Sequence, residues 1–255
     1  MSHRHFFGRA PDGFWLPYMG YVKGIERTLR SYGINYTVLD THGILFSENA
    51  PKTGIFVPDR CWNSLVVFGR DGEASQKING CEGFSSNPVY KNQEKDIGFE
   101  LEESELEGFL QPDSPRSNTL FRYWSKKDDS DSPYDSKKAL EQAKIDAAAF
   151  LDEENQKLEK ASKYLENPVL VCTIEAAALG QCWAEGMDFF EEVLRKNASS
   201  KFVATGDLIK DQFKLEKITP YPSAASGTGY GEDLLDSSNS WMLRYTRKMC
   251  ERMVD

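Results

Sequence analysis

The stretch that most constrains the fold is the run NPVLVCTI at residues 167–174. Pro168 ends any preceding helix, and the residues from Val169 to Ile174 are apolar or β-branched without alternation. Strands that are apolar on both faces are typical of parallel sheets covered by helices on each side. The run therefore predicts an α/β protein.

Other stretches continue this pattern of alternating strands and helices. Helices are expected at about 22–32, ending at Gly33, at 136–166, where Glu154 interrupts a 3–4 apolar spacing, and at 187–196. This alternation predicts βαβ units in a parallel sheet or barrel. A closed barrel of this kind has about eight strands, so the expected set indicates an incomplete barrel. The expected strands are 14–16, 34–39, 64–69, 169–174 and 201–205.

Composition limits the classes of function. The chain has 255 residues, 40% of them hydrophobic and 28% charged, as in globular proteins. Its net charge of −9 argues against non-specific binding to nucleic acid or anionic membranes. We expect neither a membrane span nor a signal peptide, because no apolar run is long enough. Five scattered cysteines without a CxxC pair indicate reduced thiols and a cytoplasmic location.

Six segments, in order, resemble the family 57 glycoside hydrolases, specifically their 1,4-α-glucan branching enzymes. They are GFWLPYMGYVKGIERTLRSYGINYTVLDTHGIL (13–45), VVFGRD (66–71), KDIGF (95–99), PYDSKKALEQAKIDAAAFL (133–151), PVLVCTIEAAALGQCWAEGMDFFEEVL (168–194) and ITPYPSAASGTGY (218–230). The resemblance implies a partial (β/α)7 barrel over residues 1–213 that lacks its first strands. A polar insert is expected at about 72–134, and a short helical remnant at 214–255.

The resemblance also implies that the catalytic residues are substituted. Tyr18 stands where the family has its nucleophilic Glu after Trp-Leu-Pro, and Glu175 stands where it has an acid/base Asp. Further family residues are replaced at Ala177, Gln181, Cys182 and Ala225, the last standing for a Trp that stacks on glucan. The scaffold is kept, and its expected substrate-binding residues are Asp40, His42, Asp71 and Trp183. We therefore expect a degenerate homologue without catalysis of its own.

Tyr18 is a poor replacement for the nucleophile. A retaining glycosidase needs two carboxyl groups about 5 Å apart, although sialidases use a Tyr nucleophile. A phenol with a pKa of about 10 needs a base, so Glu175 would have to deprotonate Tyr18 and also protonate the leaving oxygen. We interpret Tyr18 instead as filling the volume that a Glu and its waters would occupy.

Two alternatives use other residues. An active α-glucan-processing enzyme would pair Glu175 with Asp40 or Glu82. A metal-dependent hydrolase like the polysaccharide deacetylases would use Asp40 and His42 with two imidazoles from the HRH motif at residues 3–5. Because that motif lies at the terminus, where chains fray, we expect no metal and no cofactor.

The expected partners follow from the same reading. Weakly bound α-glucan is expected, whereas nucleic acid and membranes are not. Missing first strands would leave one side of the sheet open, with unpaired backbone groups. We therefore also expect either a separately encoded N-terminal half or self-association.

Overall fold

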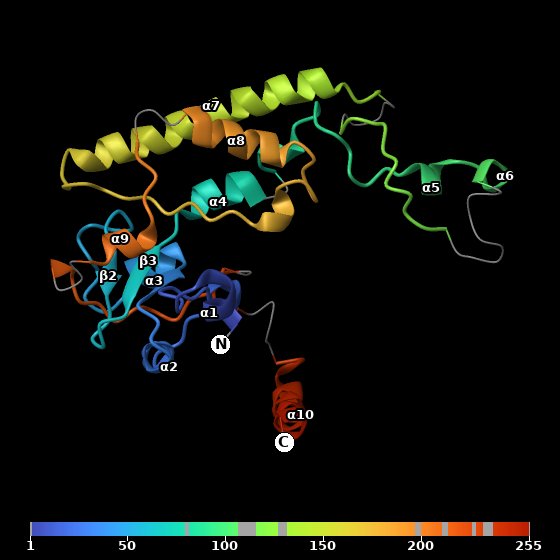
Figure 1. The fold of residues 1–255 in the computed structure, drawn as a ribbon. Helices are drawn as coiled ribbons and strands as arrows, with labels where there is room; N and C mark the ends of the chain where they lie inside the picture. The colour runs from blue at the N-terminus through green and yellow to red at the C-terminus, as the bar shows by residue number, and fades with distance from the viewer. Residues whose placement is uncertain are drawn as a thin grey trace. The chain divides into compact units, whose positions relative to one another are not determined.

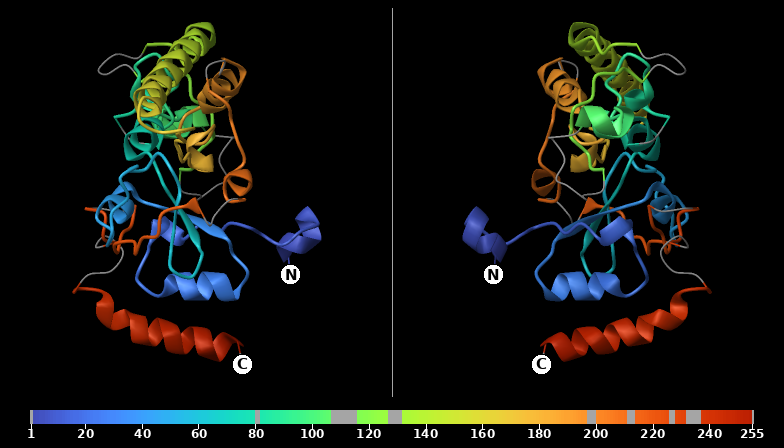
Figure 2. Two further views of the ribbon diagram at one scale, coloured as in Figure 1. Left: turned by 90° about the vertical axis from the view of Figure 1, so that its left-hand side faces the viewer. Right: turned by 90° about the vertical axis from the view of Figure 1, so that its right-hand side faces the viewer.

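The computed structural model describes residues 2–79, 82–106, 116–126, 132–196, 200–210, 214–225, 228–231 and 237–254. They form two compact units, drawn in Figures 1 and 2. Unit 1 comprises Met1–Gly72, Ala161–Val171 and Phe202–Asp255, and unit 2 comprises Glu73–Lys160 and Cys172–Lys201. Each unit is therefore assembled from stretches that are far apart in the sequence. Residues 72–134, expected as an insert, fall almost wholly in unit 2, and residues 214–255 are part of unit 1.

Unit 1 contains a small sheet with the strand order β1-β3-β2. Strands β1 (Tyr36–Leu39) and β3 (Val66–Gly69) are parallel, in register from Tyr36 opposite Val66 to Leu39 opposite Gly69. The expected strands at 34–39 and 64–69 are therefore present and pair as expected. Strand β2 (Asp59–Arg60), which the sequence does not predict, joins β3 in antiparallel fashion.

The predicted strand at 14–16 is wrong. Gly13 forms a single parallel bridge to Tyr36, the Phe14 N–H donates to the Tyr36 carbonyl oxygen at 3.1 Å, and Pro17 then begins the 3-10 turn η1 (Pro17–Met19). A proline has no N–H to donate, so the pairing cannot continue past Leu16.

The later strand predictions hold only in part. Residues 201–205 are wrong as a strand, because 201–204 are irregular and exposed and lead into helix α9 (Thr205–Leu208). The 169–174 run is reduced to one parallel bridge, between Val171 and Arg70. That bridge still places the run parallel to β3, as the apolar pattern predicts.

The helices of unit 1 are short. Helix α2 (Ile25–Ser31) fits the prediction for 22–32, and Gly33 follows it at φ +78°, a left-handed conformation that glycine adopts without strain. The others are α1 (Ser2–Phe7), α3 (Thr41–Leu45), α9, η5 (Ser240–Met242) and α10 (Leu243–Val254).

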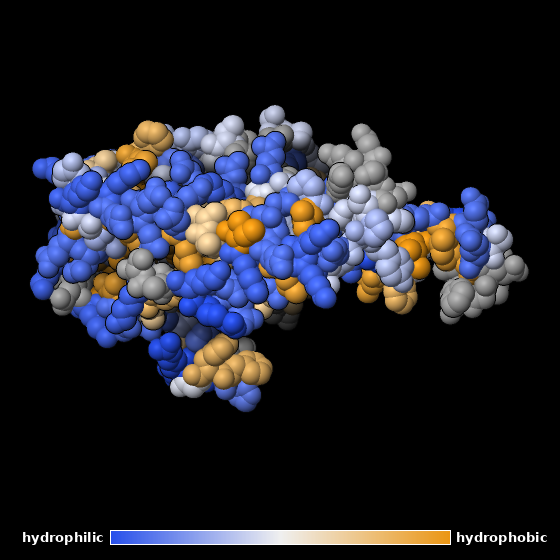
Figure 3. All heavy atoms as spheres, turned by 90° about the horizontal axis from the view of Figure 1, so that it is seen from above, coloured by the Kyte–Doolittle hydropathy of each residue, from blue (hydrophilic) through white to orange (hydrophobic). Residues whose placement is uncertain are grey.

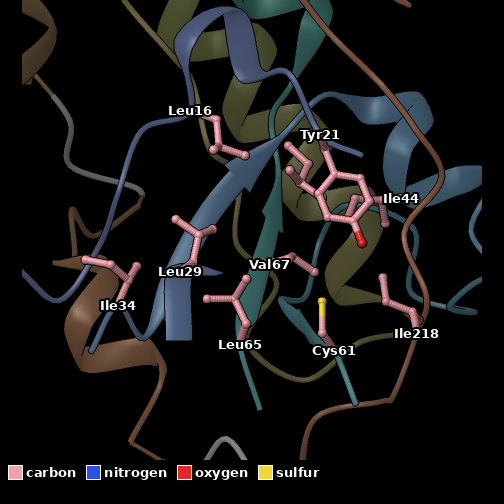
Figure 4. Packing of buried hydrophobic residues seen from close by; sticks show 10 residues of the cluster. Leu16, Tyr21, Leu29, Ile34, Ile44, Cys61, Leu65, Val67 and Ile218 are labelled. Carbon is pink, nitrogen blue, oxygen red and sulfur yellow. The ribbon is translucent and has the colours of Figure 1, made fainter. Parts of the chain in front are cut away.

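The core of unit 1 packs around these elements. Figure 4 shows Val67 of β3 and Leu65, which precedes that strand, in one cluster with Leu29 of α2 and Ile218 from the C-terminal stretch. Burial of each such aliphatic side chain stabilises the fold by roughly 1.5–3 kcal/mol. The buried cluster consists of Leu16, Tyr21, Leu29, Ile34, Leu39, Ile44, Cys61, Leu65, Val67 and Ile218.

Unit 2 is helical. Helices α4 (Gly72–Asn79), α7 (Ser136–Ser162) and α8 (Gly186–Lys196) lie side by side in Figures 1 and 2. The remaining elements are η2 (Phe84–Ser86), α5 (Ile97–Glu100), α6 (Glu103–Leu106) and η3 (Ala176–Ala178). The predictions for 136–166 and 187–196 are therefore confirmed within a few residues. The face seen in Figure 3 is mostly hydrophilic, with scattered apolar groups.

The 3–4 apolar spacing of α7 faces the core of unit 2. Ala139, Ala143, Ala147 and Phe150 are all buried there. Glu154, which interrupts the spacing, is also buried, and its Oε1 accepts a hydrogen bond from Lys157 Nζ at 2.9 Å. The carboxylate is tolerated in the stripe because a charged partner accompanies it.

The polar insert expected at about 72–134 is described only in part, because residues 80–81, 107–115 and 127–131 lie outside the described ranges. Within the described ranges, no helix has the length and apolar character that crossing a membrane requires.

Candidate functional site

The candidate site lies in unit 1, at one edge of the sheet. Because β1, β3 and the backbone at Gly13 run parallel, their carboxyl ends meet at the same edge. Asp40 follows β1 directly and the Arg70–Asp71 pair follows β3, whereas Tyr18 comes five residues after Gly13, in η1. In parallel α/β sheets, ligands bind outside this edge.

Asp40 is the centre of a buried charge network at this edge. It precedes helix α3, and both of its carboxylate oxygens are occupied. His42 Nδ1 donates to Asp40 Oδ1 at 2.8 Å, and Arg70 Nη2 lies 2.5 Å from Asp40 Oδ2. Thr41 Oγ1 donates to the Arg70 carbonyl oxygen at 2.8 Å, which ties the ends of β1 and β3 together. Such buried, charge-assisted bonds are stronger than neutral ones.

The second nitrogen of His42 reaches the C-terminal stretch. Nε2 donates to the Gly229 carbonyl oxygen at 2.7 Å. Both ring nitrogens thus face oxygen atoms of neighbouring groups. Gly229 has φ +99°, and a Cβ built on it would lie 2.6 Å from His42 Cε1. A glycine is therefore required where the chain passes the imidazole.

Residues 221–225 run alongside this edge. The Tyr21 N–H donates to the Ser223 carbonyl oxygen at 2.7 Å, and the Ala225 N–H donates to the Tyr18 carbonyl oxygen at 2.7 Å. A Cβ on Gly43 would lie only 2.4 Å from Ser223 Oγ. This close approach explains the glycine of the DTHG motif.

Tyr18 itself does not fill a buried space. Its side chain is 59% exposed, so our interpretation of Tyr18 as a volume filler is wrong. Its backbone is left-handed at φ +51°, as is that of the next residue, Met19, at φ +50°. Non-glycine residues in this region are strained, and such strain clusters at functional sites. The turn thus presents the phenol to solvent at the carboxyl edge.

The remaining predicted site residues differ in their surroundings. Asp71 of unit 1 is buried at the same edge, and its N–H donates to the Val171 carbonyl oxygen at 2.8 Å. Glu175 and Trp183 belong to unit 2. Glu175 is exposed and precedes η3. Trp183 is only 1% exposed and packs against Tyr90 and Phe189, so its indole is part of the core of unit 2.

The donor set does not suit a metal. Asp40 and His42 are bonded to each other, to Arg70 and to Gly229, which leaves no ligand atom directed at an ion. Among the described residues, no group of three or more His, Cys, Asp or Glu side chains is arranged to hold one. His3 and His5, the imidazoles that the metal alternative needs, are exposed on helix α1.

Sequence reasoning missed four participants at this edge. Arg70 lies in the intact VVFGRD segment, and Tyr221, Gly229 and Tyr230 lie in ITPYPSAASGTGY, so both motifs contained a signal. Neither motif by itself indicates that its residues lie beside Asp40 and His42. The contact through His42 joins residues that are 187 positions apart.

Comparison with known proteins tests the resemblance to the family 57 glycoside hydrolases. Residues 2–107 match the family model described as glycosyl hydrolase family 57, which confirms the resemblance. No curated protein matches the chain.

Solved structures match over nearly the whole chain. The α-amylase AmyC from Thermotoga maritima is 25% identical with a TM-score of 0.84, covering 99% of this chain and 49% of that one. Branching enzymes of the same family from Pyrococcus horikoshii and Thermococcus kodakaraensis are 22% and 18% identical, with TM-scores of 0.77 and 0.75. Each covers 94% of this chain, which spans 45% and 47% of their lengths.

These likenesses define the fold at a coarse level. The chain spans about half the length of the solved enzymes that it matches. Its described part is a mixed α/β structure with a small sheet, and the partial (β/α)7 barrel remains a prediction.

Proposed function

We propose, on the premise that this chain is a relative of the family 57 glycoside hydrolases, that it binds α-glucan without cleaving or branching it. The intact network around Asp40 supports the first half of the proposal, because it keeps the carboxyl edge of unit 1 ordered. The second half rests on the residue at the nucleophile position.

The observation that carries the proposal is the state of Tyr18. Its phenol is exposed, and no residue of unit 1 in the described ranges hydrogen-bonds its hydroxyl. A phenol becomes a nucleophile only when a base is within hydrogen-bond reach. Asp40 is held in place as a structural group, since His42 and Arg70 each contact one of its oxygens, and this disfavours it as that base or as the nucleophile. Within the described residues of unit 1, the edge therefore keeps an ordered surface for binding without a carboxylate at the nucleophile position.

This geometry also weighs against the active alternative. A retaining mechanism needs two carboxylates, one of which attacks the sugar. Both oxygens of Asp40 are already hydrogen-bonded to His42 and Arg70, which weighs against Asp40 as the attacking carboxylate. Replacement of one member of a catalytic set removes several powers of ten in rate, and the remaining members do not compensate.

Binding can be tested by affinity electrophoresis of the purified protein in native gels. Gels that contain amylopectin are compared with gels that contain dextran, whose backbone is α-1,6-linked. The proposal predicts retardation in amylopectin at millimolar affinity in glucose units, and none in dextran. Equal mobility in both gels and in a gel without polysaccharide would overturn the binding proposal.

A further inference from the structure

Two tyrosine rings are exposed beside the His42 network. Tyr221 is 45% exposed and Tyr230 is 56% exposed. Their ring centroids lie 6.3 Å apart, and the ring planes meet at 81°. Aromatic rings usually bury most of their large apolar surface, so an adjacent exposed pair indicates a contact surface.

The pair is held in place by buried groups. The Tyr230 ring lies edge-to-face against the His42 imidazole at 5.3 Å, next to the Nε2 bond to Gly229. The Tyr221 N–H donates to the Gly43 carbonyl oxygen at 2.9 Å, within the motif that contains His42. Because His42 is bonded in turn to the buried Asp40, the ring positions are set before any ligand arrives. Such preorganisation lowers the entropy cost of binding.

We infer that the Tyr221–Tyr230 pair is the aromatic contact for the glucose units of α-glucan, an inference that rests on the proposed function. A pyranose has an apolar C–H face that covers an aromatic ring, and its rim of hydroxyls can bond to a phenol oxygen. Successive units of an α-1,4 chain are tilted because the chain is helical. Two rings that meet at 81° can therefore contact successive units.

The position of the pair in the chain supports this assignment. Ala225, where the resemblance implies a stacking Trp, lies between the two tyrosines in the sequence. Its side chain offers no ring, and its N–H is bonded to the Tyr18 carbonyl oxygen. The two tyrosines thus supply aromatic surface on the stretch of chain where Ala225 stands in place of the implied Trp.

The test compares Tyr230→Ala, Tyr221→Ala and Tyr230→Phe with the parent chain in amylopectin gels. Tyr32→Ala is the matched control, because Tyr32 is 82% exposed and follows α2, ahead of the amino end of β1. We expect either alanine variant at the pair to weaken binding about tenfold, which corresponds to the loss of one ring contact. Tyr230→Phe and Tyr32→Ala should bind within about twofold of the parent chain, since each keeps the pair's ring surface.

The outcomes separate the two claims. Normal retardation of both alanine variants, with the parent chain retarded, would overturn the role of the pair and leave the proposed function standing. A parent chain that is not retarded would overturn both. If the alanine variants lose binding, circular dichroism melts that match the Tyr32→Ala melt will assign the loss to the rings. Melts that are lowered well below that of Tyr32→Ala, with Tyr230→Phe also failing to bind, would overturn the inference in favour of a structural role.

Discussion

His42 Nε2 donates to the Gly229 carbonyl oxygen at 2.7 Å and so joins the end of the first strand to the C-terminal stretch. The same imidazole is bonded through Nδ1 to the buried Asp40. One side chain therefore couples the sheet edge to the turn that carries Tyr230.

Gly229→Ala is expected to break this coupling. A methyl group there would lie 2.6 Å from His42 Cε1, and alanine is strained at φ +99°. We expect a loss of roughly 1–3 kcal/mol in the free energy of unfolding, measured in urea. Gly206→Ala is the matched control, because nothing lies within 4 Å of its Cβ position and it sits in helix α9. Equal stability of the two variants would contradict the role of the contact.

Asp59 is expected to make unit 1 less stable as pH rises. The residue is 1% exposed, and neither carboxylate oxygen has a hydrogen-bond partner among the described residues. Burial, and then the nearby Glu216 carboxylate, raise the pKa of Asp59 from 3.8 to about 7. The unfolded chain therefore ionises first, and stability falls between about pH 4 and pH 7 by up to a few kcal/mol. Urea midpoints measured at pH 5 and pH 8 test this slope.

Asp59→Asn should flatten that pH dependence. The amide carries no charge to desolvate, so we expect the variant to be more stable than the parent chain at pH 8 and similar to it at pH 5. Glu48→Gln is the control, because its side chain is 70% exposed. A parent chain and an Asp59→Asn variant with the same slope would rule out Asp59 as the source.

Asp96 should have the opposite dependence in unit 2. Burial opposes its ionisation, but hydrogen bonds from Thr119, Gly98 and Leu120 outweigh burial and lower the pKa of Asp96 to about 2. Its contribution is therefore present above the unfolded pKa near 4 and is lost as pH falls toward 2. We expect Asp96→Asn to destabilise unit 2 by about 1–3 kcal/mol at pH 7. Hydrogen exchange of the Thr119 and Leu120 amides measures this loss of stability. Glu94→Gln is the control, because Glu94 is exposed.

Restoring one carboxylate should not restore catalysis. Tyr18→Glu places a carboxylate at the nucleophile position but leaves Glu175, Gln181 and Ala225 unchanged. We expect no turnover of amylose above that of the parent chain, because residues that act as a unit are not rescued singly. Branching or hydrolysis produced by this one substitution would show that the rest of the site is competent.

The sequence allowed the main elements to be predicted where local signals were strong. The β-branched residues of β1 and β3, the 3–4 spacing of α7 and the glycine after α2 each indicate one structure. The stretches 14–16 and 201–205 also have β-type composition, yet neither is a strand. Strand formation depends on a neighbouring strand, and composition does not report whether one is present.

The site was predictable in part for a similar reason. The resemblance pointed to Asp40, His42 and Asp71, and the structure places all three at the carboxyl edge of unit 1, while their role in substrate binding stays a prediction. The contribution of Gly229 and Tyr230 depends on a contact across 187 positions, which no periodicity encodes. The exposure of Tyr18 was missed because the left-handed turn at Tyr18 and Met19 is unusual for such residues.

The central claim, α-glucan binding without catalysis, is tested most directly by product analysis on amylose. The purified chain and its Glu175→Gln variant are incubated with amylose, and α-1,6 branch points and new reducing ends are counted by proton NMR. We predict that neither protein produces signals above a protein-free control. Branch points or reducing ends that the parent chain produces and Glu175→Gln does not would contradict the claim.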